Sequence, residues 1–152
     1  MRISEEEQRD TDFDWFCVDE HGNIGHFASA GFKSIPPTVS ESAEKLRSLE
    51  EYFASLDPVP GGHQFDEGLD PAWRTERYAH TFIAMADRGL FSFDIESYPR
   101  TDICYFRVAS PKAPLRFDDL PDNIRTVLGR TVLRKRSLEH SSKISYAETL
   151  SI

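Results

Sequence analysis

Two short apolar segments, separated by turn residues, stand out in the pattern of hydrophobic and polar positions. Residues 13–19 (FDWFCVD) and residues 24–32 (IGHFASAGF) are rich in aromatic residues and β-formers, which predicts two strands. Both alternating faces of the first segment are apolar in the middle, so we expect this strand to be covered on both sides. Between the segments, Gly22 and Asn23 tolerate positive φ and predict a hairpin turn.

The hairpin also contains two histidines, which raises the question of a metal or catalytic site. If Val18 faces Ile24 across the turn, His26 faces Phe16 on the neighbouring strand and His21 stays at the turn tip. A strand advances about 3.3 Å per residue, so the two imidazoles would be too far apart to share one ion. We therefore expect a half-buried, hydrogen-bonded His26 and no metal ligand here.

A helical pattern follows the hairpin. Pro36 and Pro37 interrupt the preceding segment, and Thr38 with Glu41 matches the T-x-x-E pattern of a capping box. At 100° per residue, one side of this helix collects apolar residues and the opposite side acidic ones. The apolar side holds Leu46, Leu49, Phe53 and Leu56. The helix is expected to end by residue 57.

A second helix is predicted after a long loop, residues 57–73 (DPVPGGHQFDEGLDPAW). Asp70 and Pro71 suit the N-cap and first position of a helix, and Gly89 suits its end. Its apolar side holds Tyr78, Ala79, Phe82, Ile83, Met85 and Ala86. Loops longer than about 12 residues in a compact domain are often functional or mobile.

The remaining pattern predicts more strands and one short helix. Residues 90–95 and 103–110 are expected strands, 119–128 a short helix, and 131–136 (TVLRKR) a last strand, followed by a tail, 143–152. Residues 1–12 are so charged that we expect a flexible N-terminal tail. We predict one α+β domain over 13–152, a largely antiparallel sheet with two main helices and one short helix packed on it.

Composition and charge narrow the possible partners. The 152 residues carry a net charge of −8, and residues 1–70 hold sixteen acids but only five Lys or Arg. This charge disfavours nucleic acid and favours a basic protein partner or simple solubility. The basic cluster at 125–136 lacks interleaved aromatics, and we expect it to match the acidic first half or to protect a strand edge.

The sequence also points to a cytoplasmic protein. No apolar run approaches the roughly 20 residues of a membrane span, and the charged start does not resemble a signal peptide. Cys17 and Cys104 lie in apolar surroundings without C-x-x-C spacing. We expect two free thiols in a reducing compartment, with a single disulfide as the alternative.

Known catalytic and metal-binding patterns are absent from the sequence. There is no G-x-S-x-G, phosphate-binding loop, dinucleotide fingerprint, H-E-x-x-H or C-x-x-C, and the five histidines are scattered. We therefore expect no catalytic residues, no metal and no cofactor. The alternative is a small enzyme or ligand-binding protein with a pocket between sheet and helices, for which His26, His63 and His80 would be tested first.

A set of acidic and aromatic residues is the best candidate for binding a partner. Acids on the outer face of the first helix and in the long loop, beside apolar anchors, resemble the polar rim and core of an interface. The expected partner-binding residues are Glu41, Glu44, Glu51, Phe65, Asp66, Glu67, Asp70, Trp73 and Arg77. The alternative for each acid taken singly is a solvated surface position that binds no partner. For Trp73, the alternative is that it folds back on the loop with Arg77 covering its ring.

The first hairpin carries a family resemblance. A W-F-x-x-D-x-x-G-x-I-x-x-F pattern is met by Trp15, Phe16, Asp19, Gly22, Ile24 and Phe27. It resembles the opening hairpin of small acidic bacterial immunity proteins of polymorphic-toxin systems, and residues 104–124 (CYFRVASPKAPLRFDDLPDNI) are similar in character. The resemblance implies a cytosolic, non-enzymatic protein that neutralises a cognate toxin by binding it. Because the motif is structural, it does not locate the toxin-binding surface.

Three functional hypotheses follow. The first is an immunity protein that occludes the active site of a toxin with a basic surface. The second is the ligand-binding protein or enzyme described above. The third is a structural or regulatory subunit that forms a homodimer through its sheet edge.

Overall fold

The first hairpin forms as the alternation of apolar residues predicts. In the computed structural model, β1 (Asp14–Asp19) pairs antiparallel with β2 (Ile24–Ala28), and Phe16 lies opposite His26. Gly22 in the turn has a φ of 83°, a left-handed conformation that glycine adopts without strain. The predicted register is confirmed, although β2 is four residues shorter than the segment assigned to it.

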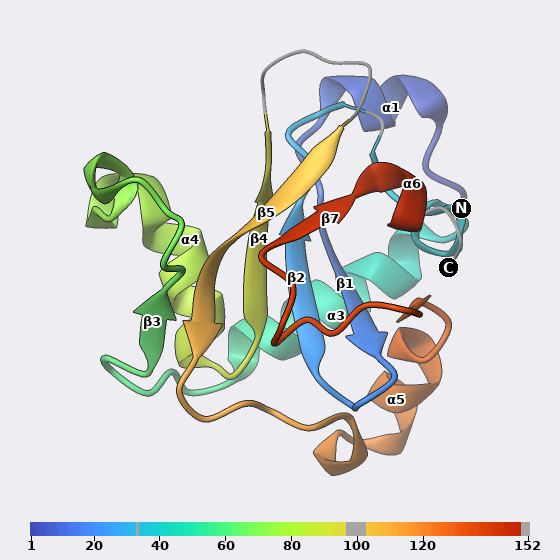
Figure 1. Ribbon diagram of the computed structural model, residues 1–152. Coiled ribbons are helices and arrows are strands. Elements are labelled where there is room, and N and C mark those ends of the chain that lie inside the picture. The colour runs from blue at the N-terminus through green and yellow to red at the C-terminus, as the bar shows by residue number, and fades with distance from the viewer. Residues whose placement is uncertain (33, 97–102, 150–152) are drawn as a thin grey trace.

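This hairpin lies inside a mixed sheet. The structure describes residues 1–32, 34–96 and 103–149, and in these it has seven strands, ordered β3-β5-β4-β2-β1-β6 with β7 also pairing with β5 (Figure 1). The further strands are β3 (His63–Phe65), β4 (Phe91–Ile95), β5 (Cys104–Pro111), β6 (Val132–Leu133) and β7 (Lys143–Ser145). Pairs β2–β4 and β1–β6 are parallel, and the other four are antiparallel. The predicted single α+β domain is confirmed.

Helices of very different length accompany the sheet. Those in the described part of the chain are α1 (Glu5–Asp10), α2 (Pro37–Ser40), α3 (Ala43–Ser55), α4 (Glu76–Asp87), α5 (Asp122–Leu128) and α6 (Tyr146–Thr149), with 3-10 turns η1 (Pro71–Trp73) and η2 (Phe117–Asp119). The two main helices and the short helix predicted from the sequence correspond to α3, α4 and α5.

One face of the sheet is covered by α3 and α4. Phe16 of β1 contacts Phe53 of α3, with 4.8 Å between ring centroids, and His26 of β2 contacts Phe82 of α4 at 5.9 Å. Phe16 and His26 are themselves cross-strand neighbours. The two helices therefore pack on the same face, and their buried apolar residues explain the amphipathic patterns seen in the sequence.

The opposite face is built from stacked aromatic rings. Phe27 lies between Trp15 and Phe93, with ring centroids 4.4 Å and 4.7 Å away, and Tyr105 meets Trp15 edge-on. Trp15 Nε1 donates a hydrogen bond to the Tyr105 hydroxyl, which in turn donates to Ser34. Trp15, Phe27, Phe93 and Tyr105 are fully buried. The expectation that β1 is covered on both sides is confirmed.

The helix starts differ from the prediction. Ser42, rather than Thr38 with Glu41, caps α3, because its hydroxyl accepts the hydrogen bond of Lys45 N. The chain forms the separate short helix α2 over the T-x-x-E pattern, so that capping box is wrong. The expected helix from Asp70 is also divided: Asp70 caps only η1, and Thr75 caps α4.

The ends of the chain are more ordered than expected. Residues 1–12, interpreted as a flexible tail, contain α1 with a Ser4 capping box, and Ile3 is buried in the main core. Ile3 N also donates to Ser40 O. At the other end, the tail of uncertain structure forms β7 and α6 as far as residue 149, and 150–152 lie outside the described residues.

Short strands account for the other differences. The long loop 57–73 contains β3, an edge strand of three residues that pairs with β5. The last predicted strand is only β6, which runs parallel to β1. Both pairings join residues distant in sequence, so local alternation carries little sign of them.

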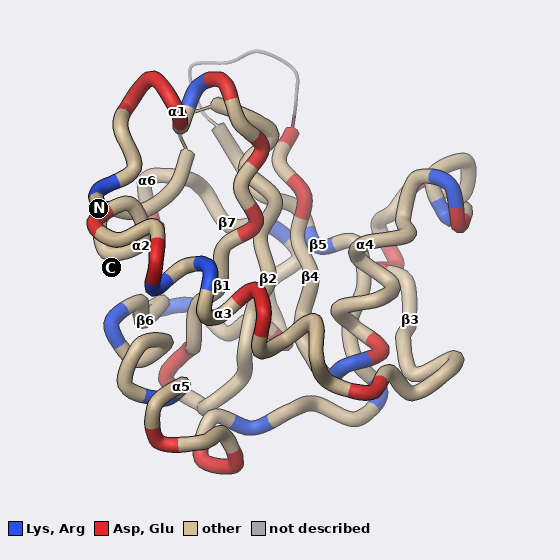
Figure 2. The backbone as a smooth tube through the Cα atoms, turned by 180° about the vertical axis from the view of Figure 1, so that it is seen from behind, with Lys and Arg blue, Asp and Glu red and all other residues tan. Residues whose placement is uncertain are grey.

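Charge is unevenly distributed over the molecule. The view from behind the sheet shows acidic residues along α1, acidic and basic residues together on α3, and basic residues near β6 (Figure 2). Some of these opposite charges meet, for example Arg130 with Glu41. In the described residues, no helix is long and apolar enough to cross a membrane.

Candidate functional site

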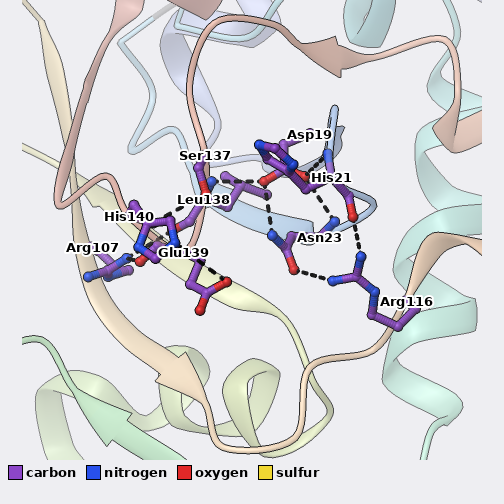
Figure 3. A network of polar contacts seen from close by, with 9 residues as sticks. All are labelled: Asp19, His21, Asn23, Arg107, Arg116, Ser137, Leu138, Glu139 and His140. Atoms are coloured by element: carbon purple, nitrogen blue, oxygen red, sulfur yellow. Dashed lines mark hydrogen bonds and ion pairs between the residues drawn. The ribbon is translucent and has the colours of Figure 1, made fainter.

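The hairpin turn is tied to two distant segments, to one by the buried Asp19 carboxylate and to the other by Arg116. Asp19 accepts hydrogen bonds from the backbone N–H groups of His21, Asn23 and Leu138, at 2.9, 3.0 and 2.9 Å (Figure 3). Arg116 donates to Asn23 Oδ1 at 2.7 Å and to the His21 carbonyl. The Asp19 carboxylate therefore satisfies buried donors, a structural role that fixes the turn.

The turn does not assemble a metal site from its histidines. His21 is exposed at the tip, whereas His26 is fully buried within the sheet. Among the described residues, no group of three or more His, Cys, Asp or Glu side chains could hold a metal ion. His21 serves the fold through its backbone, which donates to Asp19 and accepts from Arg116.

His26 forms an Asp–His–Ser arrangement that needs a separate test. Its Nδ1 lies 2.7 Å from Ser92 Oγ, and its Nε2 lies 3.2 Å from Asp14 Oδ1. The Nε2–Asp14 approach is off the hydrogen-bond direction, and Nε2 has no hydrogen-bond partner among the described residues. A nucleophilic serine must reach substrate, but Ser92 is 0% exposed. We assign the trio to packing; His26 is buried more completely than the half-buried position expected.

The other histidines considered for a ligand pocket lie apart. His63 Nδ1 is 2.8 Å from Asp87 Oδ1 on α4, and exposed His80 lies near Glu76 on the same helix. Neither pair involves His26, which contacts Phe82 and Ser92. The three histidines therefore define no common pocket.

The expected acidic residues of the first helix are mostly paired within the chain. Glu41 forms an ion pair with Arg130. Glu44 binds the N-terminal ammonium group, and this hydrogen bond lowers the pKa of Glu44. Glu51 is exposed on α3. A basic side chain of a partner protein would therefore compete with Arg130 for Glu41 and with the N-terminal ammonium group for Glu44.

The expected loop residues also have several roles. Asp66 pairs with Arg107, whose Nη2 is 2.9 Å from Asp66 Oδ1, and this Arg107 also donates to the carbonyls of Leu138 and Glu139 (Figure 3). Phe65 is half-buried and packs against the smaller core cluster. Asp66 is thus a structural residue, because its side chain is almost fully buried in this ion pair.

The remaining loop residues lie at the surface. Glu67, Asp70 and Arg77 are exposed, with Asp70 capping η1. Trp73 is 44% exposed. Because η1 and α4 are separate, Arg77 is not one helical turn beyond Trp73 as expected. Arg74 instead donates to backbone carbonyls of the loop.

Trp73 forms one wall of a hollow between the sheet and α4. The hollow, about 590 Å³ in volume, also includes Tyr78 of α4 and Phe106 of β5. The Trp73 ring meets Tyr78 at 4.7 Å and Phe106 at 6.3 Å, both edge-on. We call it the aromatic hollow and define it by Asp70, Trp73, Tyr78, Asp94, Glu96 and Phe106.

Its polar centre is Asp94 of β4. Tyr78 donates its hydroxyl to Asp94 Oδ2 at 2.6 Å, and Ile95 N donates to Asp94 Oδ1 at 2.8 Å. Burial raises the pKa of Asp94, although both hydrogen bonds oppose that shift. Burial and the bond to Asp94 raise the pKa of Tyr78 as well. The hollow therefore contains a carboxylate that is poorly hydrated and unusually receptive to a positive charge.

A second hollow, of about 660 Å³, lies along β3 and β5. Its charged walls include Asp66 and Arg107, which are already paired with each other. Phe65 and Glu67 also line it. The two hollows thus divide the expected loop residues: Phe65, Asp66 and Glu67 line this one, whereas Asp70 and Trp73 line the aromatic hollow.

The aromatic hollow is the better candidate site because its Trp73 ring is exposed and its central carboxylate has no basic side chain bound to it in the described residues. Sequence reasoning found Trp73 and Asp70 but missed Asp94 and Phe106. The only local sign was Asp94 as a charge within the apolar run LFSFDI. In the comparisons with known proteins, no family model, curated protein or solved structure matches the chain.

Proposed function

We propose that the protein is a non-enzymatic binding module for another protein, with the aromatic hollow and the adjoining loop as the centre of its interface. The observation that carries this proposal is the exposed Trp73 ring, held edge-on by Tyr78 and Phe106 and flanked by acids. Tryptophan is among the residue types most enriched at interface hot spots. Held by two neighbouring rings, it would lose little side-chain entropy on binding.

The resemblance of the hairpin motif supports a more specific form of this proposal. The partner would be a bacterial toxin, and the protein would act as its cytoplasmic immunity protein by covering a basic active-site cleft. The acidic character of residues 1–70 supports a basic partner surface, because opposite potentials accelerate association. Glu67 and Arg77, which are exposed at the surface on either side of Trp73 in the chain, would form part of the polar rim.

The test uses the product of the gene next to that of this protein, as the candidate toxin. Growth of bacteria that express this product would be measured with and without the protein. Affinity of the two purified proteins would be measured by calorimetry. Trp73→Ala should weaken binding at least about tenfold, as expected for a hot spot, and should reduce the protection of growth.

A matched control is Val59→Ala. Val59 is another exposed apolar residue, in the loop after α3, outside the aromatic hollow. This variant should bind like the wild type. Equal affinities for the wild type and a correctly folded Trp73→Ala variant would disprove the proposed surface. A non-toxic neighbour that does not bind would contradict the immunity proposal.

A second function, binding of a small ligand, is supported by the position of the same hollow. It lies between β4, β5 and α4, as expected for a pocket between sheet and helices, and combines aromatic walls with a few polar groups. Its occupant would then be a free small molecule rather than a side chain of a protein. The experiment of the next subsection separates these two cases.

A further inference from the structure

The aromatic hollow has the components of a receptor for an organic cation. Trp73, Tyr78 and Phe106 supply three aromatic rings, and Trp73 keeps nearly half of its surface open. A cation within about 6 Å of a ring centroid is attracted by the negative face of the ring, most strongly for tryptophan. The hollow therefore offers both an apolar and an electrostatic contact to the same group.

The charges in the hollow favour a cation as well. Among the described residues that line the hollow, Asp70, Asp94 and Glu96 are accompanied by one base, Lys143, which is bound to Glu96 at 3.2 Å. Among the residues that the structure describes, Asp94 forms no ion pair with a lysine or arginine. Buried carboxylates are usually paired with a cation or fully hydrogen-bonded. A cation entering the hollow would supply the missing partner.

The hydrogen bonds of Asp94 leave acceptor capacity on both oxygens. Each oxygen accepts one bond, from the Tyr78 hydroxyl and from Ile95 N, whereas a carboxylate offers about four acceptor positions. A guanidinium group can donate two parallel hydrogen bonds to one carboxylate while its flat face stacks on an aromatic ring. An ammonium group cannot stack in this way.

We propose that the aromatic hollow receives an arginine side chain of the partner protein, with the guanidinium stacked on Trp73 and hydrogen-bonded to Asp94. This inference rests on the proposed protein-binding function and names the group that the partner inserts. The Tyr78 hydroxyl occupies one acceptor position of the Asp94 carboxylate and leaves the others open to the guanidinium.

The test is a titration with a short blocked peptide, acetyl-Gly-Arg-Gly-amide, followed by the indole N–H signal of Trp73 in NMR spectra. Peptides with lysine or citrulline in place of arginine, and tetramethylammonium, are the comparison probes. The Trp15 indole is buried and bonded to Tyr105, so its signal should stay unchanged and serves as an internal reference for folding. The arginine peptide should bind at least about fivefold more tightly than the citrulline peptide.

Two variants assign the interaction to Asp94. Asp94→Asn retains an oxygen for hydrogen bonding but removes the charge, and should reduce arginine-peptide affinity at least about fivefold. Tyr78→Phe keeps the ring and frees an acceptor position on Asp94, so binding should be retained. Equal binding of the arginine and citrulline peptides, or an unchanged affinity in Asp94→Asn, would overturn the proposal.

The remaining outcomes are also decisive. Tetramethylammonium or the lysine peptide binding as tightly as the arginine peptide would overturn the assignment to arginine and favour a general cation pocket. If no peptide binds while Trp73→Ala still weakens binding of the partner protein, this inference fails and the proposed function stands. If the peptides bind but Trp73→Ala does not affect the partner protein, the arginine site exists and the proposed interface fails.

Discussion

At the scale of single residues, Asp94 makes the stability of the protein depend on pH in an unusual direction. Burial raises its pKa in the folded state above that in the unfolded chain. The folded state therefore binds the proton more readily, and stability falls as pH rises from the unfolded pKa through the folded one. Asp94→Asn should gain stability relative to the wild type over this window and keep that gain to pH 7. Urea unfolding between about pH 3.5 and pH 7 measures the difference.

Glu44 provides a control, because its effect on stability should change with pH in the direction opposite to that of Asp94. Its hydrogen bond with the N-terminal ammonium group lowers its folded-state pKa, so its contribution is present above the unfolded pKa and is lost as pH falls through the folded one. Glu44→Gln should therefore lose a little stability near neutral pH and none in acid. A pH-independent difference for Asp94→Asn would contradict the structure around β4.

At the scale of elements, the Asp19 carboxylate links the first hairpin to the segment before β7. It accepts bonds from His21, Asn23 and Leu138, and is nearly fully buried. Asp19→Ala would leave buried N–H donors unpaired, so we expect a loss of about 3 kcal/mol or more in unfolding free energy. Asp19→Asn keeps one acceptor oxygen and should lose less. Chemical denaturation of both variants makes the comparison, and equal losses would show that the carboxylate bonds are not responsible.

The elements also show how far the sequence alone can predict this fold. The hairpin register was predictable because its turn length fixes which residues face each other, and Phe16 does lie opposite His26. The start of α3 was not predictable from the sequence, because Thr38 and Ser42 are both acceptable N-cap residues. Only the packing of the short helix α2 decides between them. The order near Ile3 likewise depends on contacts with residues about forty positions away.

The same distinction applies to the candidate site. Trp73 could be selected as a candidate interface residue by its type and by its place in a loop rich in proline and acids. Asp94 and Phe106, which line the same hollow, could not be recognised in the sequence, because only the pairing of their strands brings them together. Asp94 and Phe106 are direct cross-strand partners there, twelve positions apart in the chain. A pocket formed across such a pairing has no contiguous motif.

At the scale of the whole molecule, stability and partner binding should respond differently to salt. The ion pairs include Arg9–Glu5 and Lys143–Glu96, both well exposed, and exposed pairs contribute only about 0–1 kcal/mol each. The fold is held mainly by its buried apolar core, which salt does not weaken. Raising NaCl from about 0.05 M to about 0.5 M should therefore change the unfolding free energy by less than about 1 kcal/mol.

Association with a basic partner should be far more sensitive, because the net charge of −8 acts over distances that salt screens. We expect the association rate to fall at least about tenfold over the same range, with a smaller change in the dissociation rate. Stopped-flow fluorescence of Trp73 measures both rates. The Glu67→Gln and Asp70→Asn double variant, which removes one exposed acid from the wall of each hollow, should bind more slowly at low salt and depend less on salt. An association rate that is independent of salt would mean that the partner surface is not basic, and binding would then rest on the aromatic contacts of Trp73 alone.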